Sequence, residues 1–171
     1  TRNKKTGIFQ ITLIKELTKV NKDEMNDKED KQEKKRMETR LNKYEQKIAA
    51  LIDTPKDQGV LDFSQLGIDF LMVDESQEFK NLEFSTTKKN IRGLGNPLGS
   101  KKAFNMLVAC RHLQNVYKAD KGIIFSSGTP ISNTMAELYL LFKYLRPHKM
   151  KETGITSFDR WAANFANDYA D

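Results

Sequence analysis

One stretch of the sequence decides the fold: Ile68-Asp69-Phe70-Leu71-Met72-Val73-Asp74-Glu75. Most of its first six residues are apolar, and the run stops at two adjacent carboxylates. The second apolar run and the small residues that follow it are Gly122-Ile123-Ile124-Phe125 and Ser126-Ser127-Gly128-Thr129-Pro130. Continuous apolar runs of this length, separated by a helical segment, predict parallel strands that are covered on both faces.

Helical periodicity lies between and after the two predicted strands. Ser100 is a good N-cap, and after it apolar residues recur mostly every three or four positions, which predicts a helix over residues 101–117. A second helix is predicted over residues 133–145, and it ends at Arg146 because a proline follows. The order strand, loop, helix, strand, helix is that of the crossover unit of an open parallel sheet, so we expect the α/β class.

The first part of the chain has a different composition. Residues 11–53 are dominated by Lys, Glu, Asp, Gln and Asn and contain no Gly or Pro. Apolar residues recur there every three or four positions, at Met37, Leu41, Tyr44, Ile48 and Leu51. This spacing predicts an amphipathic helix, and a shorter one is expected near residues 11–20. We therefore expect a charged helical hairpin or insertion over residues 1–60 and the α/β domain over residues 61–171.

Composition excludes several classes of protein. The chain has 171 residues and a single cysteine, so no internal disulfide can form, and its two histidines lie too far apart for a zinc cluster. Its apolar runs are shorter than the roughly 20 residues that a membrane helix needs. No signal-peptide pattern appears near Thr1. We expect a cytoplasmic protein without a membrane partner.

Positive charge is concentrated in one part of the chain. The formal net charge is +6, and residues 80–121 hold nine basic residues against two acidic ones. A loop over residues 84–99 and the start of the following helix carry five of these cations: Lys88, Lys89, Arg92, Lys101 and Lys102. We expect them to contact nucleic-acid phosphates, with binding that weakens as salt rises. The alternative is an ordinary surface loop.

Polar residues follow both predicted strands, at the edge where ligands bind in open parallel sheets. Asp74 and Glu75 follow the first strand, and one carboxylate can hold a hydrated Mg²⁺ while the other orients or deprotonates a water. Ser127 and Thr129 follow the second strand in a tight turn that leads into a helix. Because neighbouring strands place such loops side by side, we expect one site.

Longer motifs around these residues resemble a known family. They are Val73-Asp74-Glu75-Ser76-Gln77-Glu78-Phe79-Lys80-Asn81, Ser127-Gly128-Thr129-Pro130-Ile131-Ser132-Asn133, Glu137-Leu138-Tyr139 and Tyr144-Leu145-Arg146-Pro147. The first resembles motif II of the Swi/Snf-type helicase-like ATPases of superfamily two, and the others are similar to motif III. The segments Phe158-Asp159-Arg160-Trp161-Ala162 and Thr86-Thr87-Lys88 resemble the subgroup of phages and conjugative mobile elements, in which the helicase module accompanies a DNA adenine methyltransferase.

The resemblance covers about residues 68–165 and implies the C-terminal part of the first RecA-like lobe of a DNA-dependent ATPase, with ATP and Mg²⁺ as cofactors. It makes Asp74 the metal ligand and Glu75 the general base for attack of water on the γ-phosphate. Positions that couple nucleotide state to nucleic-acid binding are matched by Gln77, Ser127, Gly128 and Thr129. Gln77 stands where the Asp-Glu-Ala-His form of the motif has histidine, and its amide can still bridge the two motifs by hydrogen bonding.

The sequence contains no P-loop, G-x-x-x-x-G-K-[ST]. In the Gly-rich stretch, three residues instead of four separate Gly95 from Gly99, and Ser100 follows instead of Lys. We therefore expect a P-loop segment before Thr1 and a second RecA-like lobe after Asp171, so that this chain alone does not hydrolyse ATP. Double-stranded DNA and a DNA methyltransferase domain are the other expected partners. The alternative is a non-catalytic helicase-like scaffold that binds DNA or a protein.

Overall fold

The computed structural model describes residues 66–84, 99–132 and 134–165, and the single residues Lys35, Glu38, Thr39, Asn42, Gln46, Phe63 and Thr86. The chain divides into two compact units, Thr1–Ile68 and Asp69–Asp171. In the first unit, the five described residues from Lys35 to Gln46 are helical. The rest of the predicted hairpin lies outside the described residues, so the hairpin and the division at residue 60 stay predictions.

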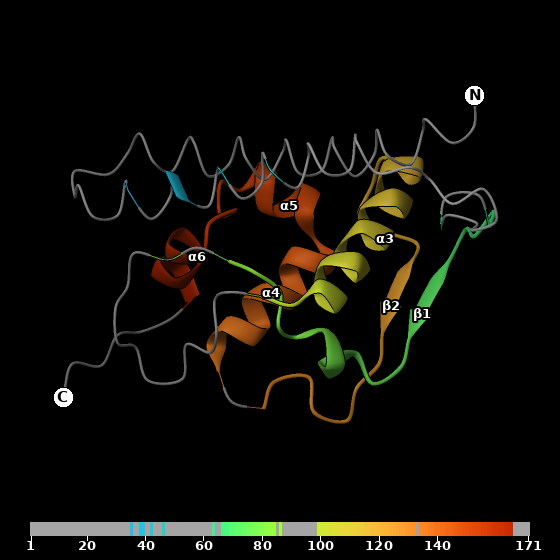
Figure 1. The fold of residues 1–171 in the computed structure, drawn as a ribbon, viewed down its shortest axis with the longest axis horizontal. Helices are drawn as coiled ribbons and strands as arrows, with labels where there is room; N and C mark the ends of the chain where they lie inside the picture. Colours follow the sequence, from blue (N-terminus) through green and yellow to red (C-terminus); the bar gives the residue numbers. More distant parts are fainter. Residues whose placement is uncertain are drawn as a thin grey trace. The chain divides into compact units, whose positions relative to one another are not determined.

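The second unit combines helices with a small parallel sheet. Strand β1 is Leu71–Val73 and strand β2 is Ile123–Phe125, with Met72 opposite Ile124. The helices are the 3₁₀ helix η2 (Ser76–Phe79), α3 (Lys101–Tyr117), α4 (Met135–Leu145), α5 (Pro147–Glu152) and α6 (Phe158–Phe165). Both strands run toward the lower edge of Figure 1, and α3, which connects them in the sequence, lies beside β2 and runs in the opposite direction. This mixture is compatible with the predicted α/β class, although each strand is shorter than its apolar run.

Helix α3 begins and ends where the sequence predicts, and α4 ends at the predicted residue but begins at Met135, after the predicted start at residue 133. The Ser100 hydroxyl accepts a hydrogen bond from the backbone N–H of Ala103 at 3.2 Å and caps α3. The Thr134 hydroxyl caps α4 in the same way through the N–H of Glu137, at 3.3 Å. Pro147 ends α4 and opens α5, where its missing N–H costs no helical hydrogen bond. None of the helices in the described part of the chain combines the length and the apolar character needed to cross a membrane.

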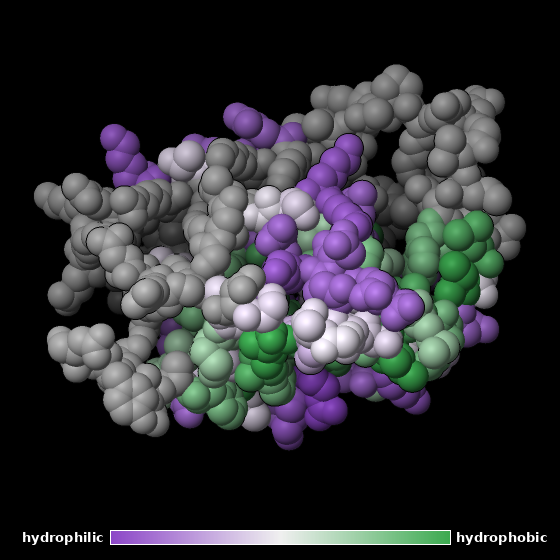
Figure 2. Space-filling model, turned by 90° about the horizontal axis from the view of Figure 1, so that it is seen from below, coloured by the Kyte–Doolittle hydropathy of each residue, from purple (hydrophilic) through white to green (hydrophobic). Residues whose placement is uncertain are grey.

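The helices of the described residues cover one face of the sheet. Leu71, Ile123 and Phe125 pack against the core that the helices form, whereas Met72 and Ile124 on the opposite face are 71% and 47% exposed. Figure 2 shows hydrophobic residues at the surface on the side where the strands lie. The prediction of strands covered on both faces is therefore wrong for the described residues, because their helices gather on a single face.

An aromatic cluster joins α4 to α6. The side chain of Trp161 is fully buried and contacts the rings of Tyr139, Phe142, Phe158 and Phe165. The aromatic face of α6 therefore packs on the domain. The indole N–H of Trp161 is buried and has no hydrogen-bond partner among the described residues, and a buried donor left unpaired costs about 1–3 kcal/mol.

Cys110 belongs to the core of α3. Its side chain is fully buried, and burial raises the pKa of the thiol to about 12. The thiol therefore stays protonated at neutral pH, because the thiolate would have to form in apolar surroundings. Cys110 is therefore a packing residue of the core.

Asp120, in the turn before β2, holds the start of α5. Its carboxylate accepts hydrogen bonds from the backbone N–H groups of His148 and Lys149, both at 3.0 Å, and lies 2.7 Å from Nδ1 of His148. Burial by itself would raise the pKa of Asp120, but the hydrogen bonds from His148 and Lys149 outweigh burial and lower it. His148 lies in the first turn of α5.

The Asp120 cap predicts a pH-dependent stability. Because its folded pKa is lowered, the carboxylate stabilises the fold above the unfolded pKa of about 4, and this contribution is lost as pH falls through the folded pKa. Near pH 6, Asp120→Asn should lower the free energy of unfolding by about 1 kcal/mol, and near pH 3 by much less. Urea denaturation at both pH values measures this. Glu152→Gln, which removes an exposed partner of Lys149, is the control and should change little at either pH.

Two glycines should respond differently to alanine. Gly99 has φ = +70°, and a Cβ there would lie 2.6 Å from the backbone N of Glu83. A Cβ on Gly128 would meet no atom within 4 Å. Gly99→Ala should therefore lower the free energy of unfolding by more than about 1 kcal/mol. Gly128→Ala should change it by no more than about 0.5 kcal/mol. Equal denaturation midpoints for the two variants would contradict this view of the turn before α3.

Candidate functional site

Backbone hydrogen bonds join the two strand ends. The N–H of Ser126 donates to the carbonyl of Val73 at 2.8 Å, and the carbonyl of Ser126 accepts from the N–H of Ser76 at 2.9 Å. The loops that follow β1 and β2 therefore lie side by side, as the sequence predicts. Asp74 and Glu75, both exposed, stand at this junction.

Glu75 has an unusual backbone. Its φ of 50° and ψ of 46° lie in the left-handed region, which costs a residue with a side chain about 1–2 kcal/mol. Its N–H donates to Oδ1 of Asp74 at 2.9 Å, and η2 begins at the next residue. Strained backbone of this kind persists where the surroundings hold it, and it gathers at functional sites.

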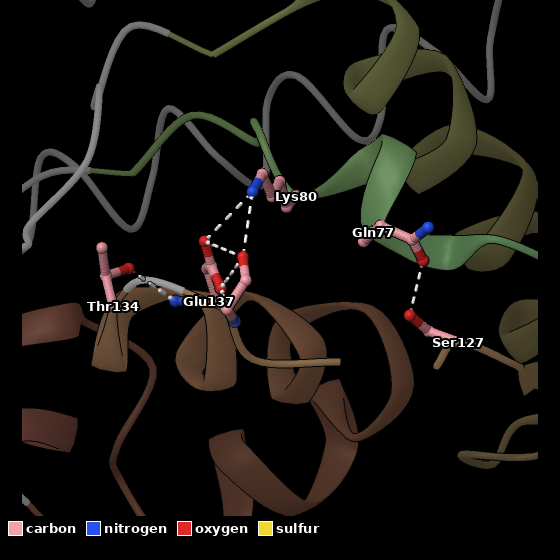
Figure 3. A network of polar contacts seen from close by, with 6 residues as sticks. Gln77, Lys80, Ser127, Thr134 and Glu137 are labelled. Atoms are coloured by element: carbon pink, nitrogen blue, oxygen red, sulfur yellow. Dashed lines mark hydrogen bonds and ion pairs between the residues drawn. The ribbon is translucent and has the colours of Figure 1, made fainter. Parts of the chain in front are cut away.

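Gln77 bridges the two loops by hydrogen bonds, as Figure 3 shows for its contact with Ser127. The Ser127 hydroxyl donates to Oε1 of Gln77 at 2.5 Å, and Nε2 of Gln77 donates to Oε2 of Glu75 at 2.5 Å. The hydroxyl of Ser127 also accepts from the N–H of Thr129 at 3.1 Å. Four of the residues singled out from the sequence thus form one hydrogen-bonded chain.

This hydrogen-bonded chain has a direction. A carboxylate only accepts, so Glu75 requires the NH₂ end of the Gln77 amide, and Oε1 must then face Ser127. The Ser127 hydroxyl gives its only proton to that oxygen and keeps its lone pairs for Thr129. Every donor therefore points toward Glu75, and a movement of the turn after β2 would change the position of that carboxylate.

A second bridge links the same two segments further along. Nζ of Lys80, just after η2, lies 3.5 Å from Oε1 of Glu137 and donates to the Ser132 hydroxyl at 3.1 Å. Oε2 of Glu137 accepts from the backbone N–H of Ser132 at 2.7 Å. Figure 3 shows this bridge beside the contact between Gln77 and Ser127. The Glu137 side chain is only 9% exposed, and the residue sits in the first turn of α4.

Tyr144 supports η2 from below the surface. Its buried hydroxyl lies 3.0 Å from the carbonyl oxygen of Phe79 and 2.9 Å from that of Ala103. Burial raises the pKa of Tyr144, so the hydroxyl stays neutral. One side chain of α4 thereby ties the end of η2 to the first turn of α3.

The cations predicted to bind nucleic acid are described in part. Lys101 and Lys102 are exposed at the start of α3. Lys102 forms an ion pair with Glu78 at 2.9 Å and lies over the ring of Phe79, and its hydrogen bond lowers the pKa of Glu78. The remaining cations of this prediction, Lys88, Lys89 and Arg92, lie outside the described residues.

The surface around the junction is polar. Figure 2 shows hydrophilic residues over the middle of the face that holds η2 and the turn after β2. A small pocket between η2 and α4 has a mainly apolar lining, and its residues are Ser76, Gln77, Phe79, Lys80, Phe125, Pro130, Glu137, Leu140, Leu141 and Tyr144. No group of three or more His, Cys, Asp or Glu residues in the described ranges could hold a metal ion.

Sequence reasoning quoted Lys80, Ser132 and Glu137 as parts of motifs but gave them no role. One local signal was available, because a threonine three residues before a glutamate is the pattern of a capping box at a helix start. In that pattern the glutamate reaches back to the N-terminal side of its helix, and Glu137 does so by binding the N–H of Ser132. No local sequence pattern indicates that Glu137 pairs with Lys80.

The fold and the site define a mixed α/β protein with interlocked polar loops at the carboxyl ends of two parallel strands. A family model described as a probable helicase domain matches residues 3–171, so the chain belongs to this family. Family membership indicates a helicase-related function. Comparison with curated proteins and comparison with solved structures gave no match.

The left-handed geometry of Glu75 gives a prediction about stability. Asparagine tolerates this region better than other residues with a side chain, whereas glutamine has the same backbone cost as glutamate. Glu75→Asn should therefore be more stable than Glu75→Gln, by about 0.5–1 kcal/mol. Both variants remove the charge, and only Glu75→Gln keeps the side-chain length that reaches Gln77, so a higher urea midpoint of Glu75→Asn would report the backbone. Identical midpoints would show that the geometry carries no strain.

Proposed function

We propose that this chain is the C-terminal part of the first RecA-like lobe of a Swi/Snf-type, DNA-dependent ATPase. The observation that carries the proposal is the hydrogen-bonded chain from Thr129 through Ser127 and Gln77 to Glu75. It joins an exposed acidic pair to the turn after the neighbouring strand. Membership of the probable helicase domain family supports the same conclusion.

In this proposal Glu75 orients the attacking water and accepts its proton. The amide of Gln77 is neutral, so it fixes the carboxylate by a hydrogen bond without cancelling its charge. Ser127 and Thr129 connect that carboxylate to the turn after β2, so a shift of the turn when the γ-phosphate leaves would be felt at Glu75. This is the coupling that a translocating motor requires.

The residues present fit Mg²⁺ and ATP. Mg²⁺ is bound in nucleotide sites by one or two carboxylates, by water and by phosphate oxygens, so Asp74 alone is a sufficient protein ligand. When bound, Mg²⁺–ATP supplies the phosphoryl group and neutralises charge that develops during its transfer. The phosphates also need a P-loop, which residues 1–171 do not contain. We propose that a P-loop segment and a second RecA-like lobe outside these residues complete the site.

Double-stranded DNA is the proposed partner. Lys101 and Lys102 lie next to η2, and the ion pair between Lys102 and Glu78 connects this basic segment to the acidic motif. Phosphates that bind these lysines would compete with Glu78 and so reach the segment that follows Glu75. A DNA methyltransferase domain in the same protein is part of the proposal and rests on the resemblance alone.

The decisive variant is Glu75→Gln in the full protein that contains this chain. Loss of the general base should lower DNA-stimulated ATP hydrolysis by about 10²–10⁴-fold, while nucleotide binding persists. Glu152→Gln is the control, because it removes an exposed glutamate of α5 that has no part in the proposed site, and it should retain hydrolysis close to that of the unsubstituted protein.

The outcomes of this experiment separate two functions. Equal hydrolysis by the Glu75→Gln variant and the unsubstituted protein would refute the general-base role. A full protein that binds DNA but never hydrolyses ATP would instead be a non-catalytic helicase-like scaffold.

A further inference from the structure

We infer that the ion pair between Lys80 and Glu137 is a latch that sets the position of the turn after β2 relative to η2. Through this position the latch controls how strongly DNA stimulates ATP hydrolysis. The structural part of this inference stands on the contacts alone, and the part about DNA stimulation rests on the proposed function. The polar contacts of the latch come from Lys80, Ser132 and Glu137.

The latch is a second side-chain contact between two segments that are far apart in the sequence. Lys80 lies three residues after Gln77, and Ser132 lies five residues after Ser127. Gln77 binds Ser127 at one point, while Lys80 binds Ser132 and Glu137 at another. The contacts at Ser126 and Ser127 hold only the start of the turn, so its far end could still pivot. The contact of Lys80 with Ser132 and Glu137 fixes that far end as well.

Glu137 is the residue on which the latch depends. Its carboxylate connects Lys80 to the turn after β2, since Oε1 lies 3.5 Å from Nζ of Lys80 while Oε2 accepts the N–H of Ser132 at 2.7 Å. The residue is only 8% exposed, so water cannot easily replace a lost partner. Without Lys80, the carboxylate stays buried with less compensation of its charge, and it gains by moving outward together with Ser132.

The ion pair between Lys102 and Glu78 provides a contrast within the same motif. Its N–O distance of 2.9 Å is shorter, but its side chains are 55% and 63% exposed. Exposed pairs of this kind contribute little, because water replaces either partner. The latch differs from this surface pair because its carboxylate is buried. It also joins the segment after η2 to the turn after β2.

Hydrogen exchange in the full protein tests the latch directly. The N–H of Ser132 donates to Glu137, so in Lys80→Met this amide should exchange at least about tenfold faster than in the unsubstituted protein. Lys80→Arg keeps the charge and should restore most of the protection. Lys102→Met, the matched control, removes a lysine of the exposed pair and should leave Ser132 unchanged. Unchanged exchange in Lys80→Met, or the same increase in Lys102→Met, overturns the latch.

ATP hydrolysis tests the second part of the inference. Lys80→Met should reduce the ratio of DNA-stimulated to DNA-independent hydrolysis several-fold, and Lys80→Arg should recover it. An unchanged ratio together with faster exchange at Ser132 refutes the control of DNA stimulation. Absence of hydrolysis in the unsubstituted protein refutes the proposed function, while the exchange experiment still decides the structural latch.

Discussion

The site depends on the two backbone hydrogen bonds of Ser126. Its N–H binds the last residue of β1, and its carbonyl binds the residue with which η2 begins. Between these two points the chain has only Asp74 and Glu75 in which to turn, and the left-handed conformation of Glu75 makes the turn possible. Backbone bonds do not depend on side-chain identity, so both carboxylates remain exposed for chemistry.

Some of the side-chain contacts around this turn lie near the surface, and others are buried. Near the surface, Gln77 links Glu75 to Ser127 through an amide that both donates and accepts. Deeper in the domain, Tyr144 holds the end of η2, and Glu137 joins the segment after η2 to the start of α4. The polar residues therefore form bridges between segments, while the aromatic cluster of α4 and α6 supplies the apolar packing beneath them.

The secondary structure could be predicted because its signals are local. An N-cap at Ser100, apolar spacing along the chain and a proline after Arg146 each act within a few residues, and the helices formed accordingly. The exposure of Met72 and Ile124 could not be predicted in this way. An apolar run shows that a strand can be buried, but the number of faces that are covered depends on where all the helices pack.

The candidate site was predictable in part for the same reason. Adjacent strands bring their ends together, so Asp74, Glu75 and Ser127 were expected to meet, and the bridging role of Gln77 followed from the resemblance. The φ angle of Glu75 and the pairing of Lys80 with Glu137 were not expected. Both arise from the tertiary structure, in which a turn must be closed and a buried carboxylate must find a cation.

The chain also carries two internal reporters of its own core. It has one tryptophan and one cysteine, and both Trp161 and Cys110 are fully buried. Indole fluorescence therefore follows the packing between α4 and α6, whereas the rate of thiol modification follows the opening of α3. Since the two side chains lie on different helices, a partial loss of structure would change one signal before the other, and no label has to be introduced.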